Sequence, residues 1–103
     1  MSMKRDRPTA EHILAVLEVR QGVAMRATDI YRAMIAKGHI HTGKAISDNY
    51  KWLIGQGKVA KAGRGLYGIP NVRVDGTRYL VVVYREGTKG TVELGKVEQD
   101  AKP

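Results

Sequence analysis

The chain has no cysteine and no phenylalanine among its 103 residues. Without cysteine there is no disulfide framework, no thiol nucleophile and no cysteine-ligated zinc. No apolar run approaches the about 20 residues that a membrane-spanning helix needs. The positively charged start is not followed by the apolar segment of a signal peptide. These absences predict a cytoplasmic protein with no membrane partner.

The charge is strongly unbalanced. The formal net charge is +8, and most of it falls on the first two thirds of the chain. Residues 1–71 carry twelve Lys and Arg against five Asp and Glu, whereas residues 72–103 carry six against five. A clustered basic surface attracts polyanions, chiefly through phosphate contacts and the release of counterions. The length allows one small domain with one modest core.

Two helices are predicted after a short basic segment. Residues 1–8 contain Lys4, Arg5 and Arg7 without apolar periodicity, which is typical of a flexible arm. Thr9 is the expected N-cap of a first helix that Gly22 ends. A second helix is expected from Ala27 or Thr28 to Gly38, with an apolar stripe of Ile30, Met34 and Ile35.

The segment from residue 42 to residue 70 is the most informative part of the sequence. Thr42 is the expected cap of a third helix over residues 42–56, because apolar residues recur at helical spacing at Ile46, Tyr50, Leu53 and Ile54. Gly57 ends this helix. Two β-prone runs, 58–62 and 66–69, then flank Gly63-Arg64-Gly65, where glycine permits a tight hairpin. A helix that leads directly into a hairpin with arginine at its tip indicates binding to duplex DNA.

A second hairpin is predicted over residues 72–98, followed by a disordered tail over residues 99–103. The run 78–85, RYLVVVYR, is a strong strand, and residues 91–97 are its natural partner across a turn at residues 87–90. The first strand is apolar on both faces, and its edge needs a partner strand. This pattern favours a homodimer through the hairpin. The alternative is that the hairpin packs on its own domain.

Two phrases, DIYRAMIAKGH and AISDNYKWLIGQGKVAKAGRGLYGIP, resemble the winged helix-turn-helix regulators of bacteria and phage, including MarR-like and antitoxin-type proteins. In these proteins the third helix ends in leucine, and a glycine, a basic strand and a G-R-G-x-Y wing follow. The resemblance covers roughly residues 9–70. It implies an α+β fold, a winged helix-turn-helix domain over residues 9–71 with three helices and a β-wing, here with an added C-terminal β-hairpin. It also implies transcriptional regulation through double-stranded DNA.

The predicted DNA-binding residues lie on the third helix and the wing. The helix would enter the major groove, where its N-terminal half reaches base edges, and the polar residues there are Thr42, Lys44, Ser47, Asp48 and Lys51. A carboxylate near phosphates is unfavourable unless Asp48 reads a cytosine or pairs with one of the two lysines. Arg64 at the tip suits a minor groove or a phosphate, with Lys58 and Lys61 as phosphate partners.

Other chemistry finds little support in the sequence. Gly38 and Gly43-Lys44 match part of a P-loop, but Ala45 stands where the magnesium-binding hydroxyl is needed. His39 and His41 are expected to be exposed, and His12 is the only further histidine. We therefore predict no catalytic site, metal or cofactor. The alternative functions are a plasmid or phage replication or partition protein, and a winged-helix protein-interaction module.

Overall fold

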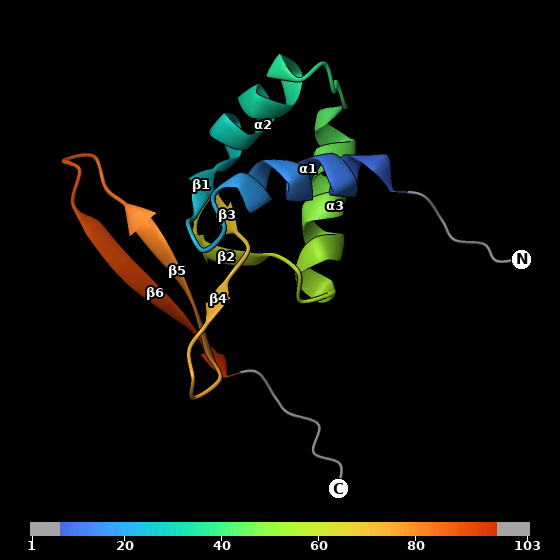
Figure 1. Cartoon of the computed structure of the whole chain (residues 1–103). Coiled ribbons are helices and arrows are strands. Elements are labelled where there is room, and N and C mark those ends of the chain that lie inside the picture. Colours follow the sequence, from blue (N-terminus) through green and yellow to red (C-terminus); the bar gives the residue numbers. More distant parts are fainter. Residues whose placement is uncertain (1–6, 97–103) are drawn as a thin grey trace, which may run out of the picture.

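A computed structural model describes residues 7–96, which form three helices and two small antiparallel sheets (Figure 1). The fold is therefore α+β, as expected. The helices are α1 (Pro8–Val19), α2 (Ala27–Ala36) and α3 (Gly43–Gly55). The strands are β1 (Met25–Arg26), β2 (Ala60–Gly63), β3 (Leu66–Gly68), β4 (Asn71–Val72), β5 (Thr77–Val83) and β6 (Lys89–Lys96). The strand order is β1-β3-β2 in one sheet and β4-β5-β6 in the other.

The start of α1 differs from the sequence-based prediction. The N-cap is Arg7 and Pro8 is the first helical residue, so the prediction of Thr9 as N-cap and of an arm through residue 8 is wrong. Proline suits this position because its fixed φ matches the helix and its missing N–H would be unpaired there anyway. Thr9 is instead buried in the first turn. The rest of the predicted arm, residues 1–6, lies outside the described residues, as does the predicted tail over residues 99–103.

The boundaries of α3 agree closely with the prediction. The hydroxyl of Thr42 accepts a hydrogen bond from the Ala45 N–H at 3.1 Å, which confirms Thr42 as the N-cap. Gly57 adopts a φ of 76° just beyond the helix, where glycine is favoured. The apolar stripe is narrower than expected, because Ile54 is 38% exposed, and Ile35 on α2 is likewise 43% exposed.

The molecule has three layers. The helices pack around a core whose fully buried members are Ile13, Leu17, Ile30, Met34, Leu53 and Val59. The β1-β3-β2 sheet lies between these helices and the C-terminal sheet (Figure 1). Its helix-facing side holds Tyr67, whose ring stacks on that of Tyr50 with centroids 4.1 Å apart. Its other side, with Ala24 and Ala60, packs against Leu80 and Val82 of β5.

Strand β5 is central in its sheet. Along one side it pairs with β6, and along the other it pairs with β4. Residues 22–24 continue that second side, because the Ala24 N–H donates to the Val81 carbonyl at 2.9 Å and the Val81 N–H donates to the Gly22 carbonyl at 2.8 Å. The further strand that the edge of β5 was expected to need is therefore supplied by the same chain. One face of β5 also packs on the same chain, as both interpretations of the hairpin expected.

Candidate nucleic-acid interface

Helix α3 presents a polar face to solvent. Its buried residues are Ile46, Tyr50 and Leu53, which point toward the core. The five residues predicted to face DNA on this element are all exposed: Thr42, Lys44, Ser47, Asp48 and Lys51. Because a turn of helix takes 3.6 residues, Lys44, Ser47, Asp48 and Lys51 share the side opposite the buried stripe. Thr42 is exposed at the N-cap, on the side of the buried stripe.

Lys44 and Asp48 form an ion pair on this surface. The Lys44 Nζ lies 3.1 Å from the Asp48 Oδ2, one helical turn further along. Both side chains are largely exposed, so the pair stabilises the helix only slightly. The pair also offsets the negative charge of Asp48 on this surface. This pairing was one of the alternatives that the sequence left open for Asp48.

The other flank of α3 is attached to the beginning of α1. The guanidinium of Arg7 lies 4.2 Å from the centroid of the Trp52 ring, and its Nη1 donates to the Asn49 Oδ1 at 3.3 Å. Cation–π contact and hydrogen bonding together hold this arginine against α3. Sequence reasoning placed Arg7 in a free arm and missed this role. No local pattern signals it, because the two partners are more than 40 residues further along the chain.

The tip of the β2–β3 hairpin is held close to α2. Arg64 is exposed between Gly63 and Gly65, and Gly65 has a φ of 69° that glycine tolerates without strain. The Gly65 carbonyl accepts a hydrogen bond from the Ala27 N–H at 2.9 Å. This bond satisfies one of the free N–H groups at the start of α2. The tip therefore has a fixed position relative to the helices.

Lys61 lies on the side of the hairpin that faces α3. It pairs in register with Tyr67, so the two side chains project from the same face of the sheet. That face stacks on α3 through Tyr50. Lys61 is exposed beside this contact, and Arg64 is exposed at the tip of the same hairpin.

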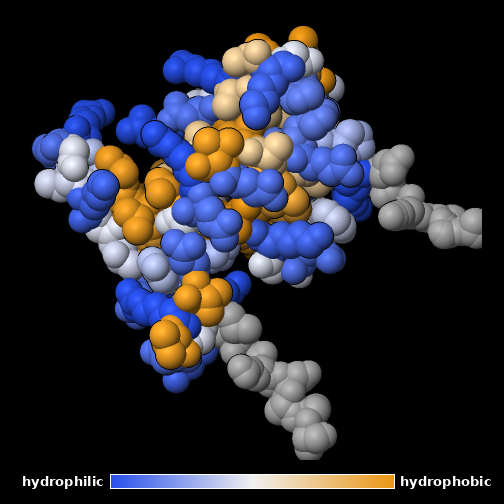
Figure 2. All heavy atoms as spheres, viewed as in Figure 1, coloured by the Kyte–Doolittle hydropathy of each residue, from blue (hydrophilic) through white to orange (hydrophobic). Residues whose placement is uncertain are grey.

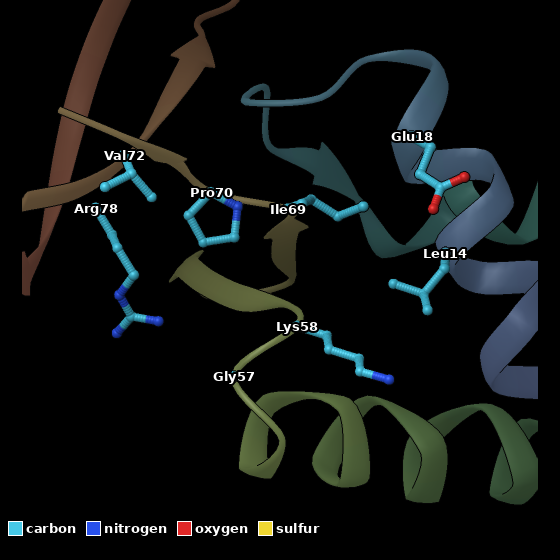
Figure 3. A pocket seen from close by; sticks show the side chains of 8 residues that line it. All are labelled: Leu14, Glu18, Gly57, Lys58, Ile69, Pro70, Val72 and Arg78. Atoms are coloured by element: carbon cyan, nitrogen blue, oxygen red, sulfur yellow. The ribbon is translucent and has the colours of Figure 1, made fainter. Parts of the chain in front are cut away.

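Lys58 is placed differently from the other predicted residues. It follows Gly57 at the C-terminal end of α3, with its Nζ 5.8 Å from the centroid of the Trp52 ring. Its side chain lines a separate cavity beside α1 (Figure 3). The structure therefore separates Lys58 from the N-terminal half of α3, where the other helical candidates lie.

The basic side chains of this surface have no acidic partners except at Lys44. The two ion pairs within residues 7–96 are Lys44–Asp48 and Arg73–Glu93. Lys51, Lys61 and Arg64 are thus exposed cations without a carboxylate partner in that part of the chain. Exposed cations without a carboxylate partner are suited to anionic oxygens such as those of phosphate.

The three histidines converge beside the start of α3. The His12 and His39 rings stack with centroids 3.6 Å apart, and the His12 Nδ1 lies 2.8 Å from the His41 Nε2. The His41 Nδ1 is also 2.9 Å from the Thr9 hydroxyl. These contacts tie the α2–α3 loop to α1, next to the cap Thr42. The expectation of simple exposure is therefore wrong for both His39 and His41, which are half-buried.

The spacing of His39 and His41 was the available signal for this cluster, because alternate residues of an extended segment point the same way. The position of His12 depends on how the helices pack and could not be read from spacing. Within residues 7–96 no group of three or more His, Cys, Asp or Glu side chains is arranged to hold a metal ion. The observed contacts instead show that the histidines join the α2–α3 loop to α1.

Comparison of the chain with protein-family models, with curated proteins and with solved structures finds no match. None of the helices within residues 7–96 combines the length and the apolar character needed to span a membrane.

Proposed function

We propose that the protein binds duplex DNA as a winged helix-turn-helix regulator of transcription. The order of elements, α1-β1-α2-α3-β2-β3 with β3 central in the first sheet, supports this proposal. In this arrangement α3 enters the major groove and the β2–β3 hairpin is the wing. A bacterial, phage or plasmid regulator of this kind works in the cytoplasm, where the DNA is.

The observation that carries the proposal is the surface shared by α3 and the wing. The stack of Tyr50 on Tyr67 holds the two elements together. The exposed cations Lys51, Lys61 and Arg64 lie on these elements without carboxylate partners among the described residues. Lys51 and Lys61 suit phosphates, and Arg64 suits a phosphate or a narrow minor groove.

Base reading is assigned to the N-terminal half of α3. Thr42, Lys44, Ser47 and Asp48 are exposed there. Hydroxyl groups can donate to or accept from base edges, and a lysine suits the acceptors of guanine. Lys44 and Asp48 are paired in the free protein, so replacing Lys44 also leaves the Asp48 carboxylate without its partner.

The experiment is a salt titration of binding to fluorescently labelled random duplex DNA, followed by anisotropy. We expect the logarithm of affinity to fall linearly with the logarithm of salt, with a slope of about −0.9 for each phosphate neutralised. Replacing Lys51, Lys61 and Arg64 together with alanine should reduce the slope by about 0.9 for each side chain that contacts a phosphate. Lys89→Ala, an exposed lysine at the start of β6, is the matched control.

Selection from random duplexes with sequencing then tests base reading. Lys44→Ala and Ser47→Ala should change the preferred sequence, at about 1–3 kcal/mol for each lost base contact. Affinity that stays flat between low and physiological salt would contradict DNA binding and favour a docking module. Unchanged preference in both variants would remove the reading role from α3.

A homodimer through residues 72–98 stays a prediction. The outer face of β5 offers Val83, which is 49% exposed, and the half-buried Val81. Beside them Arg73 lies 4.7 Å from the centroid of the Tyr79 ring and pairs with Glu93 at 2.6 Å. This face is therefore less apolar than the sequence suggested. Sedimentation at micromolar concentration distinguishes a dimer from a monomer of 11.4 kDa.

A further inference from the structure

A cavity of about 500 Å³ lies beside α1 and the C-terminal end of α3, away from the N-terminal half of α3. Its walls come from α1, from the connection that leaves the C-terminal end of α3, and from the chain between β3 and β5 (Figure 3). The lining residues are Leu14, Glu18, Gly57, Lys58, Ile69, Pro70, Val72 and Arg78. Of the residues assigned to DNA contact from the sequence, Lys58 alone lies here.

The middle of the cavity is apolar. Ile69 and Pro70 are half-buried side by side, and Figure 3 shows them between Arg78 at one end and Leu14 at the other. Val72 extends this apolar wall and is 58% exposed. Hydrophobic side chains are also visible where β4 turns toward β5, at the lower end of the molecule in Figure 2. Such apolar surface gains free energy when a ligand removes it from water.

Arg78 supplies a positively charged guanidinium group at one end of the cavity. Its Nε is buried and has no hydrogen-bond partner. Buried donors are nearly always paired, because an unpaired one loses its bonds to water without replacement. The Nε has almost no accessible surface, so a carboxylate or sulfonate would bind the terminal nitrogens of the guanidinium, a planar group that can hold two oxygens at once. Lys58 adds a second positive charge to the lining.

Glu18 fixes the orientation of a ligand. It is the one acidic residue among the lining residues, and Figure 3 shows it at the α1 end, opposite Arg78. Within residues 7–96 neither Glu18 nor Arg78 belongs to an ion pair. An anionic group is therefore attracted to the Arg78 end, where no lining carboxylate opposes it, whereas Glu18 and Lys58 both lie toward the α1 end.

We propose that this cavity binds a small amphipathic anion, with its acidic group on Arg78 and its apolar body along Ile69, Pro70 and Leu14. The cavity borders the connection from α3 to the wing through Gly57 and Lys58. A ligand there contacts the segment that joins the two proposed DNA-binding elements. The binding of a ligand to this cavity does not require DNA, so it can be tested independently of the proposed function.

The test uses 8-anilinonaphthalene-1-sulfonate, a fluorescent amphipathic anion, with the full chain and no DNA. We expect saturable binding at one site, displaced by octanoate but not by octanol at equal concentration. Arg78→Met keeps an unbranched side chain without the charge, and should weaken binding at least about tenfold, the loss expected for a charge-assisted hydrogen bond. Glu18→Gln removes the opposing charge from an exposed position and should strengthen binding.

Lys61→Met is the control, since Lys61 lies on the wing and outside the cavity lining. Circular dichroism melting shows whether each variant is folded, and Glu18→Gln keeps the test valid if Arg78→Met unfolds. Equal binding by the wild type, Arg78→Met and Glu18→Gln would overturn the proposal. So would equal displacement by octanol.

Discussion

The hydroxyl of Tyr50 lowers the stability of the contact between α3 and the wing. The ring is 6% exposed and stacks on Tyr67 with an interplanar angle of 4°. Its hydroxyl is buried without a hydrogen-bond partner, which costs about 1–3 kcal/mol relative to a hydroxyl that is solvated by water. Tyr50→Phe removes the hydroxyl and keeps the stack. We therefore expect the free energy of unfolding at pH 7 to rise by about 1 kcal/mol.

The same burial makes stability depend on alkaline pH. Burial, with a smaller contribution from the neighbouring Tyr67, raises the pKa of Tyr50 from 10.0 to about 12. The folded protein thus holds this proton more tightly than the unfolded chain. The resulting stabilisation is complete below pH 10 and is lost as the pH rises from 10 toward 12. At about 1.36 kcal/mol for each pKa unit, a shift of about two units amounts to a total loss of roughly 3 kcal/mol.

Urea denaturation, followed by far-ultraviolet circular dichroism at pH 7, 10 and 11, measures both effects. The wild type should lose stability between pH 10 and 11 more steeply than Tyr50→Phe. Tyr67→Phe is the matched control, since it removes a hydroxyl from the other ring of the stack. If Tyr50→Phe is less stable than the wild type at pH 7, its hydroxyl is hydrogen-bonded in solution and the reasoning fails. Equal alkaline losses in both proteins would refute the pKa argument.

Two further predictions test the packing between the sheets. A Cβ on Gly68 would lie 2.7 Å from a Leu80 methyl group and 2.8 Å from the Val23 carbonyl oxygen, so Gly68→Ala should cost about 1–3 kcal/mol. Gly63→Ala, whose Cβ meets its nearest neighbour at 3.4 Å, should cost less in the same thermal melts. Leu80→Glu would bury a charge at a side chain with no exposure and should prevent stable folding, whereas Val83→Glu should change stability by only about 0.5 kcal/mol. Similar melting of these two glutamate variants would mean that the faces of β5 are wrongly assigned.

The elements were predictable where short-range chemistry determines them. Thr42 caps α3 through a bond to a residue three positions away, and the Gly63-Arg64-Gly65 turn depends on local backbone freedom. The apolar spacing that predicted α3 also exposes its polar residues, so the candidate surface on this helix followed from the sequence. The identity of the elements and most of that surface were therefore accessible without coordinates.

The sequence did not show which segments meet across the chain. Strand β4 has only two residues, too few for a periodic signal, and it occupies the side of β5 that was expected to be free. Arg7 reaches Asn49 and Trp52, and the histidines meet across two segments. Each of these contacts depends on how α1 and the sheets pack. Lys58 shows the same limit, because it was predicted from its place at the start of the wing, whereas its neighbours in space line a cavity.

The C-terminal sheet packs on the side of the wing that faces away from the helices. This packing affects how rigid the wing is in the proposed binding to DNA. Tyr67 stacks on α3 from one side of the first sheet, while Leu80 and Val82 pack on the other side. The hydrogen bond between Gly65 and Ala27 fixes the tip. A wing held on both faces loses less conformational freedom when it meets DNA, and less of the binding free energy is spent on ordering it. The hairpin after residue 72 thus contributes to DNA affinity in this proposal through the position of Arg64, whether or not it joins two copies of the chain.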